Sequence, residues 1–227
     1  MPSPDDVLRL RGVAQDVTEH RTVRRIVAAV DLVVHAGETV AVVGRSGTGK
    51  STLLNVMGLL AEPAEGEVWV CGERSDHVGS RRRDERRARD IGFVFQTMNL
   101  VAHLDVVENV VLGCPSGAVG RAAAVELLGR LGLAGLAERR AATLSLGEQQ
   151  RVAVARAVAK KPRLVLADEP TGSLDAQNEK AVLDLLTGVA EAGAAVVVVT
   201  HSPVVAEWAD RVVTLLETGL LQEGSPA

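Results

Sequence analysis

The stretch from Gly44 to Ser51 constrains this chain of 227 residues more than any other part of it. It reads Gly-Arg-Ser-Gly-Thr-Gly-Lys-Ser, which matches the pattern G-x-x-x-x-G-K-[ST] of a phosphate-binding loop. An apolar, β-branched run at 39–43 precedes it, and a segment rich in Leu and Met at 52–57 follows it. Because strand, glycine loop and helix in that order are the context in which this motif works, a chance glycine turn is disfavoured.

The loop predicts the chemistry of its ligand. Its glycines allow φ values that a Cβ forbids, so successive N–H groups can surround phosphate oxygens, and the following helix N-terminus adds partial positive charge. Lys50 would add a full charge at the β- and γ-phosphates, and the Ser51 hydroxyl would ligate Mg²⁺. We therefore expect a nucleoside triphosphate to bind to Gly44, Arg45, Ser46, Gly47, Thr48, Gly49, Lys50, Ser51 and Thr52.

Composition excludes several other classes of protein. A hydrophobic content of 47% with 24% charged residues is that of a soluble globular domain, and a formal charge of −4 gives no overall attraction to nucleic acid. The arginine cluster at 81–90 is interrupted by acidic residues and has no interleaved aromatics, which favours a solvated helix face over a nucleic-acid site. Cys71 and Cys114 have no metal or redox spacing and are interpreted as inert reduced thiols.

Cellular location is predicted from what the sequence does not contain. It has no apolar run long enough to span a membrane, and the first six residues lack the pattern of a signal peptide. We therefore expect a cytoplasmic protein that reaches a membrane only by docking to another protein.

The order of apolar patterns predicts an α/β fold. Buried-strand patterns at 39–43, 91–95, 164–167 and 196–199 alternate with helical patterns, which indicates a mostly parallel sheet covered on both faces. Short strand-like patterns at 7–10 and 27–32 come first, a last strand is expected at 211–216, and a polar tail follows it. A helical and loop-rich block from 97 to about 140 separates two strands of the sheet, so we interpret it as an inserted helical subdomain.

Polar side chains stand where the predicted strands end. The strand 164–167 delivers Asp168 and Glu169, which we assign to the Mg²⁺ shell and to orienting or deprotonating a water molecule, respectively. Gln96 and His201 also end strands, where ligands of open α/β sheets gather. A lone Gln or His is usually structural, and two acids after a core strand can be surface residues. The presence of the phosphate loop favours the functional interpretation of all four.

Six motifs in one order give the chain a family resemblance. They are the loop at 44–51, Gln96, the segment Leu-Ser-Leu-Gly-Glu-Gln-Gln-Arg at 144–151, the strand and acids at 164–169, Ser-Leu-Asp at 173–175, and His201. With them the chain resembles the nucleotide-binding subunit of an ATP-binding cassette (ABC) transporter over nearly its whole length. The segments 91–96 and 171–175, with Asn99 and Leu100, are most similar to the lipoprotein-release and macrolide-export branch.

The resemblance implies a fold and an assembly. It implies a P-loop NTPase (RecA-like) core within one cassette domain at 1–227, an N-terminal antiparallel β subdomain, and a helical subdomain at approximately 97–160. Two cassettes would sandwich two ATP molecules, each between the loop of one chain and Ser145 and Gly147 of the other. The dimer would form from two copies or with a paralogous subunit, on the cytoplasmic face of the membrane, and drive an integral membrane permease; no nucleic-acid partner is expected.

The resemblance also implies residue roles. Lys50, Glu169 and His201 would be catalytic, with His201 on the γ-phosphate. Ser51, Gln96 and Asp168 would hold Mg²⁺.

Two positions depart from the family pattern. Leu146 stands where the signature normally has Gly, and we expect its Cβ to restrict the backbone and to crowd the dimer interface. Near Val17, relatives usually carry a Tyr that stacks on adenine, but this chain has no Tyr. Val17, or nearby His20, would have to contact the base instead, which predicts weaker base selectivity because stacking contributes about 1–3 kcal/mol per base.

Three functions remain open at this stage. The first is an ATPase that powers an export-type or lipoprotein-release transporter. The second is a non-transport cassette that acts on DNA, ribosomes or the division machinery. The third is a regulatory module whose hydrolysis Leu146 has weakened. A P-loop kinase or GTPase is disfavoured because no guanine-reading motif is present.

Overall fold

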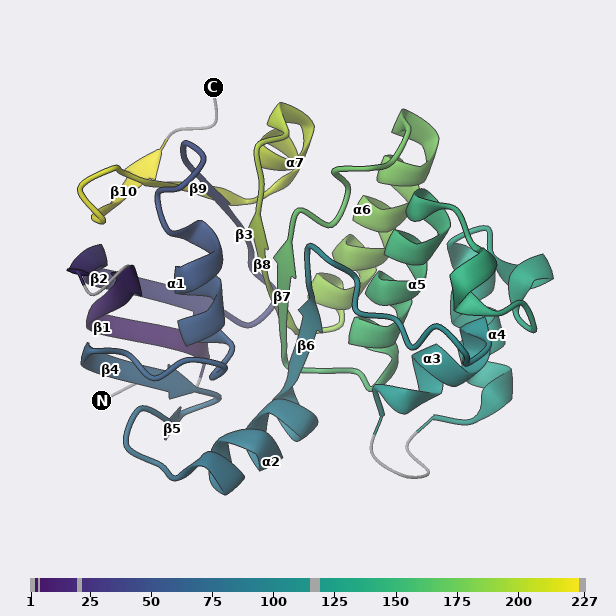
Figure 1. Cartoon of the computed structure of the whole chain (residues 1–227), viewed down its shortest axis with the longest axis horizontal. Helices are drawn as coiled ribbons and strands as arrows, with labels where there is room; N and C mark the ends of the chain where they lie inside the picture. The colour runs from purple at the N-terminus through teal and green to yellow at the C-terminus, as the bar shows by residue number, and fades with distance from the viewer. Residues whose placement is uncertain (1–2, 4, 20–21, 115–118, 225–227) are drawn as a thin grey trace.

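The computed structural model describes residues 3, 5–19, 22–114 and 119–224 (Figure 1). Its central sheet has the strand order β10-β9-β3-β8-β7-β6. Every neighbouring pair is parallel except β10 with β9. The strands are β3 (Thr39–Val43), β6 (Ile91–Val94), β7 (Leu164–Asp168), β8 (Ala195–Val199), β9 (Arg211–Leu215) and β10 (Leu221–Gly224).

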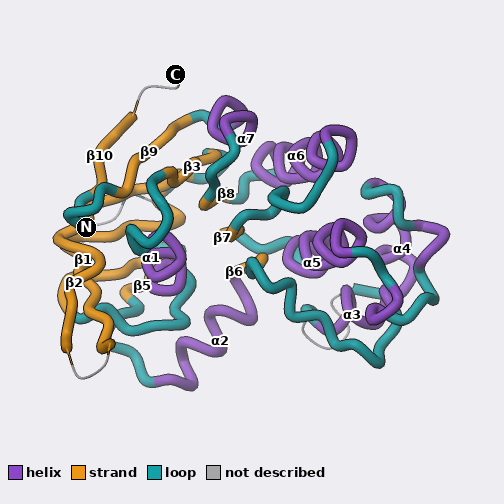
Figure 2. Tube along the Cα trace, turned by 45° about the horizontal axis from the view of Figure 1, so that its top comes forward, coloured by secondary structure: helices purple, strands orange, loops and turns teal. Residues whose placement is uncertain are grey.

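The central strands are buried on both faces, as near-continuous apolar runs require. Every residue of β7 and β8 is buried. Alternate side chains of β7 enter two separate cores: Leu164 and Leu166 pack with α1 (Lys50–Met57), whereas Val165 and Ala167 pack with α5 (Leu146–Ala159) and α6 (Ala176–Glu191). Figure 2 shows α1 on one side of the sheet and α5 and α6 on the other. The predicted parallel core is confirmed.

A second sheet is antiparallel, with the order β2-β1-β4-β5. The patterns at 7–10 and 27–32 prove to be parts of two strands of 14 residues each, which are longer than expected. This sheet shares one apolar core with α1, so α1 is packed between the two sheets. The strands are β1 (Asp6–Glu19), β2 (Thr22–His35), β4 (Glu65–Val70) and β5 (Glu73–Arg74).

Helices fill the part of the molecule farthest from this second sheet (Figure 1). There α3 (Val106–Leu112) and α4 (Arg121–Arg130) both pack against α5. Two short 3₁₀ turns, Ala134–Leu136 and Ala141–Thr143, lead into α5. The presence of a helical insertion is confirmed, while its boundaries at 97–160 stay a prediction.

The arginine cluster forms α2 (Ser80–Asp90), whose charges are largely neutralised by neighbours. Arg81 pairs with Glu85 at 3.1 Å, Arg86 with Glu73 at 2.6 Å, and Arg87 with Asp84. The prediction of a solvated helix face is therefore confirmed, and ion pairs cover much of it.

The end of the chain differs from the predicted polar tail. After β9 the chain turns through Gly219, which has φ 79°, and returns as β10. The Gly219 carbonyl accepts a hydrogen bond from the Ala28 amide at 2.8 Å, and a Cβ on Gly219 would lie 2.7 Å from the Ile26 carbonyl oxygen. This close approach requires glycine and fixes the position of Ile26.

The remaining α-helix of the described residues is α7 (Pro203–Trp208), with Ser202 as its N-cap and Pro at its first position. Among the residues that the structure describes, no helix combines the length and the apolar character needed to cross a membrane.

Candidate nucleotide site

The loop between β3 and α1 has the backbone that its glycines predict. Gly44, Gly47 and Gly49 have φ values of 154°, 80° and 99°. A Cβ on Gly44 would lie 2.5 Å from the Leu215 carbonyl oxygen, and one on Gly49 would overlap Ile26. Gly49 caps α1 without any side-chain hydrogen bond, which leaves the first N–H groups of the helix available to an anion.

The side chain of Lys50 folds back over the loop that precedes it. Its side-chain amine donates hydrogen bonds to the carbonyls of Gly44 at 2.8 Å and Arg45 at 3.0 Å, and lies 3.2 Å from Nε2 of His201. Burial lowers the pKa of Lys50, and the carboxylates of Glu169 and Asp168 partly oppose this effect. A buried cation held by main-chain carbonyls of its own loop and lying beside His201 is well placed to meet phosphate oxygens.

Glu169 is held in an unusual conformation. Its φ is 49°, a value uncommon outside glycine. The Glu169 amide donates to the Val199 carbonyl at 2.9 Å, and the Thr200 hydroxyl donates to Oε2 at 3.3 Å. The other oxygen, Oε1, is buried without a hydrogen-bond partner among the described residues and lies 3.8 Å from Nε2 of His201. A buried acceptor left unpaired is costly, so this atom is suited to accept a proton from a bound molecule.

These groups line one cavity of about 330 Å³ at the carboxyl ends of β3, β7 and β8. This is a size typical of small-molecule sites. It brings together most of the residues predicted from sequence: Val17, Ser46, Gly47, Gly49, Lys50, Ser51, Thr52, Gln96, Asp168, Glu169 and His201. His20, the alternative contact to the base, lies outside the described residues.

Other predicted residues support the loop instead of lining the cavity. The Thr48 hydroxyl donates to the Arg45 carbonyl at 3.0 Å, and the Gly44 and Arg45 carbonyls hold Lys50. The Arg45 side chain points outward and pairs with Glu217 at 2.7 Å. Gly44, Arg45 and Thr48 therefore stabilise the shape of the loop.

Ser145 and Gly147 lie at the N-terminus of α5 and do not line the cavity. Ser145 forms a capping box, in which its amide donates to Glu148 at 2.7 Å and its hydroxyl accepts from the Glu148 amide. A Cβ on Gly147 would lie 3.2 Å from Cδ2 of Leu174, so this glycine also permits close packing against the segment 173–175.

The expected backbone restriction at Leu146 is wrong. Leu146 is the first residue of α5, has ordinary helical backbone, and exposes 58% of its surface. This conformation accepts a residue with a Cβ without strain. Leu146 can therefore affect function only through the contacts that its exposed side chain makes with another molecule.

Sequence reasoning missed three residues of the site. The Gln150 amide donates to the Glu169 carbonyl at 2.5 Å and accepts from the Ser173 hydroxyl, so it joins α5 to the strand end that carries Glu169. Thr200 contacts Glu169 directly, and its place beside His201 could have indicated it. Ile26 lines the cavity but depends on how β2 lies against the loop, for which the sequence has no signal.

Fold and site together define a P-loop nucleotide-binding domain of α/β class. A family model described as ABC transporter matches residues 27–172. The lipoprotein-releasing system ATP-binding protein LolD of Paramagnetospirillum magneticum is 43% identical, with 95% of this chain and 97% of the relative covered. The macrolide export ATP-binding/permease protein MacB 2 of Yersinia pestis is 40% identical over 96% of this chain but only 33% of the relative.

Solved structures agree. A dimeric post-hydrolysis structure of the ATP-binding cassette MJ0796, bound to ADP and Pi, has a TM-score of 0.91 at 35% identity and covers 97% of this chain and 99% of that one. The chain belongs to the ABC transporter family, and it is an ATP-binding cassette with ATPase function.

Val17 supplies a test of how the base is held. We expect Val17→Tyr to tighten ATP binding at least about fivefold, because an aromatic ring on a base contributes about 1–3 kcal/mol. Isothermal titration calorimetry would measure this, with Val17→Leu as the matched aliphatic control and tripolyphosphate as a ligand without a base. Equal ATP affinity in Val17→Tyr and the wild type would show that the base lies elsewhere.

Proposed function

We propose that this cassette hydrolyses ATP at sites shared between two copies and so drives a separate membrane permease of the lipoprotein-release or macrolide-export type. The observation that carries the proposal is Oε1 of Glu169, which is buried without a hydrogen-bond partner in the described part of the chain and lies in the cavity with Lys50 and His201. A carboxylate there can orient a water molecule and accept its proton in line with the γ-phosphate.

The other residues divide the work by their chemistry. Lys50 and the N-terminus of α1 bind the β- and γ-phosphates, and His201 contacts the γ-phosphate. Ser51, Gln96 and Asp168 line the cavity with hydroxyl, amide and carboxylate oxygens, the ligand types that Mg²⁺ prefers. We propose that they hold this ion, which neutralises phosphate charge when bound.

The cavity within one chain is half of the proposed site. The N-terminus of α5, with Ser145 exposed, lies outside the cavity of its own chain. Because a helix N-terminus attracts anions, the N-terminus of α5 from a second copy is suited to contact the γ-phosphate and so to complete the cavity. The dimeric state of the similar cassette MJ0796 supports this arrangement.

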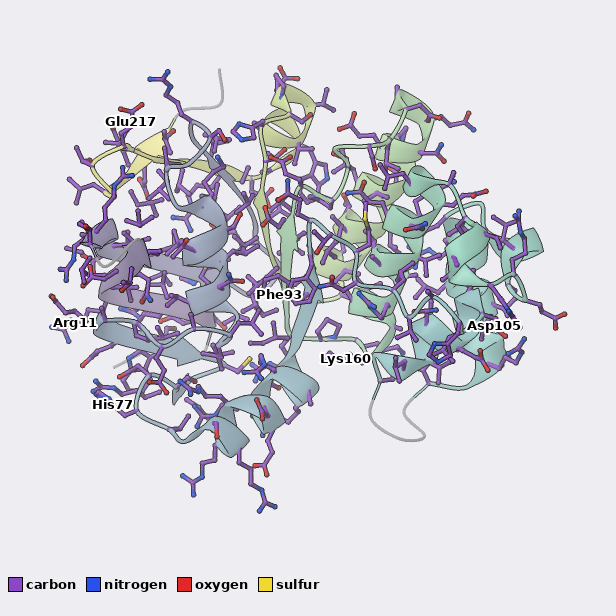
Figure 3. The ribbon with its side chains drawn as sticks, in the orientation of Figure 1. Arg11, His77, Phe93, Asp105, Lys160 and Glu217 are labelled. Carbon is purple, nitrogen blue, oxygen red and sulfur yellow. The ribbon has the colours of Figure 1, made fainter. Side chains whose placement is uncertain are left out.

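A second cavity, of about 340 Å³, supports a membrane partner. It lies beside the segment that carries Gln96 and is lined by Phe93, Phe95, the half-exposed Leu60 and Lys160, among other residues. Figure 3 labels Phe93 and Lys160 near the middle of the molecule, on β6 and at the end of α5. We propose that a cytoplasmic segment of the permease docks here, which would hold the cassette on the cytoplasmic face of the membrane.

Glu169→Gln tests the proposed function. We expect ATP hydrolysis to fall by about a hundredfold or more, since the general base is lost, while ATP still binds. An ATP-bound dimer should then accumulate and be detected by size-exclusion chromatography with light scattering. Glu207→Gln, an exposed acid on α7, is the matched control. Undiminished hydrolysis by Glu169→Gln would contradict the role assigned to Glu169.

The departure at Leu146 favours one alternative, a weakly hydrolytic regulatory cassette, and Leu146→Gly discriminates between the two. Because Leu146 is exposed and has ordinary helical backbone, we expect an unchanged fold and an ATPase rate within about threefold of the wild type. Steady-state phosphate release measures the rate, and circular dichroism checks the fold. A rise of about tenfold or more would favour the regulatory alternative.

A further inference from the structure

A cavity of about 790 Å³ lies away from the nucleotide site, between α4 and α6. The end of α5 and the segment 161–163 form its floor. Arg163 and Ala194, which line it, immediately precede β7 and β8, whereas the nucleotide cavity lies where these strands end. The two cavities therefore lie at opposite ends of the strands β7 and β8, and they share no lining residue.

The groove exists because small residues face each other across it. Both α4 and α6 pack against α5, and in Figure 2 they lie on separate sides of it. Ala123 of α4, Gly188 of α6 and Ala192, the C-cap of α6, line the space between them. Residues 188 and 192 are four positions apart at the end of α6, so both small residues lie on the side of the helix that lines the groove.

The groove carries positively charged side chains that form no ion pair with the described part of the chain. Arg130, Lys161 and Arg163 line it and are exposed. Within the described residues, none of the three has a carboxylate within 4.0 Å, in contrast to the paired arginines of α2. Arg130 lies directly over α6, since a Cβ on Gly188 would be 3.2 Å from its Nη2. Glu126 is the one acid in the described lining, within a chain whose net charge is −4.

Apolar side chains make up the remainder of the surface. Val158 of α5 and Leu185 of α6 are buried, while Leu127 of α4 and Val189 of α6 are partly exposed. A ligand that complements this groove is therefore apolar along its body and carries negative charge.

We propose that the groove binds an anionic amphiphile, which is an aliphatic chain that ends in a carboxylate or phosphate group. The head group lies against Arg130 and Lys161, where the guanidinium and ammonium supply charge-assisted hydrogen bonds. The chain lies along the floor between α4 and α6. This site is additional to the nucleotide site and does not depend on how ATP is hydrolysed.

Calorimetry with the full chain and decanoate below its micellar concentration tests the proposal. We expect decanoate to bind, and octanoate to bind roughly tenfold more weakly because two fewer methylenes are buried. Decyltrimethylammonium has the same tail and the opposite charge, so it should bind at least about tenfold more weakly than decanoate. No binding of decanoate, equal binding of the two amphiphiles, or displacement of decanoate by ATP would each overturn the proposal.

Variants locate the site. Arg130→Glu and Lys161→Glu should each weaken decanoate binding at least about tenfold, whereas Arg82→Glu, an equal charge change on exposed α2, should not. Ala123→Trp should fill the groove and abolish binding, while Ala122→Trp, its exposed neighbour outside the groove, should not. Unchanged ATPase activity would show that each variant is folded. If Arg130→Glu and Lys161→Glu bind as the wild type does, the assigned site is wrong.

Phospholipid vesicles would distinguish whether the anionic amphiphile is a lipid of a bilayer or a free molecule. Sedimentation with anionic phospholipid vesicles, competed by free decanoate, would identify a bilayer lipid as the occupant. Binding of decanoate without sedimentation would identify a free amphiphile.

Discussion

The left-handed backbone of the loop 44–49 is the constraint on which the site depends. Three glycines with positive φ turn the chain around Lys50 and leave the N-terminus of α1 without a side-chain cap. Both effects concentrate positive charge at one point, where the carboxyl ends of β7 and β8 deliver Asp168, Glu169 and His201. A Cβ at Gly44 or Gly49 would collide with β9 or with Ile26, so neither the loop nor the pocket could form with other residues.

Helix α5 connects this pocket to the surface around Ser145, which is proposed to contact a second copy of the chain. Its first turn presents Ser145, while Gln150, one turn further on, bonds to the main chain of Glu169. Arg156, at the other end, donates to the Asn99 carbonyl at 2.7 Å and so holds the segment after Gln96, where Met98 and Asn99 have positive φ. Hydrogen bonds therefore tie α5 both to the strand end that carries Glu169 and to the segment that follows Gln96.

The site residues that could be predicted from the sequence are those that belong to a contiguous motif or follow the end of a strand. The loop, Gln96, Asp168, Glu169 and His201 could be placed because the carboxyl ends of parallel strands meet at one edge. Ile26 and Gln150 could not, because their roles depend on the packing of β2 over the loop and of α5 against β7. The strand β10 was missed because Gln222 and Glu223 give no apolar alternation, and its pairing with β9 is made by the backbone. The restriction expected at Leu146 failed because position 146 is helical.

Mixing two inactive variants tests the central claim that each site is shared between two chains. Lys50→Ala removes the loop cation, and Ser145→Arg blocks the N-terminus of α5, so each protein alone should lose ATPase activity. Random pairing gives mixed dimers in roughly half of cases, each with one complete site, so the mixture should recover roughly a quarter of wild-type activity. Full activity of Ser145→Arg alone, or a mixture as inactive as its components, would contradict a shared site.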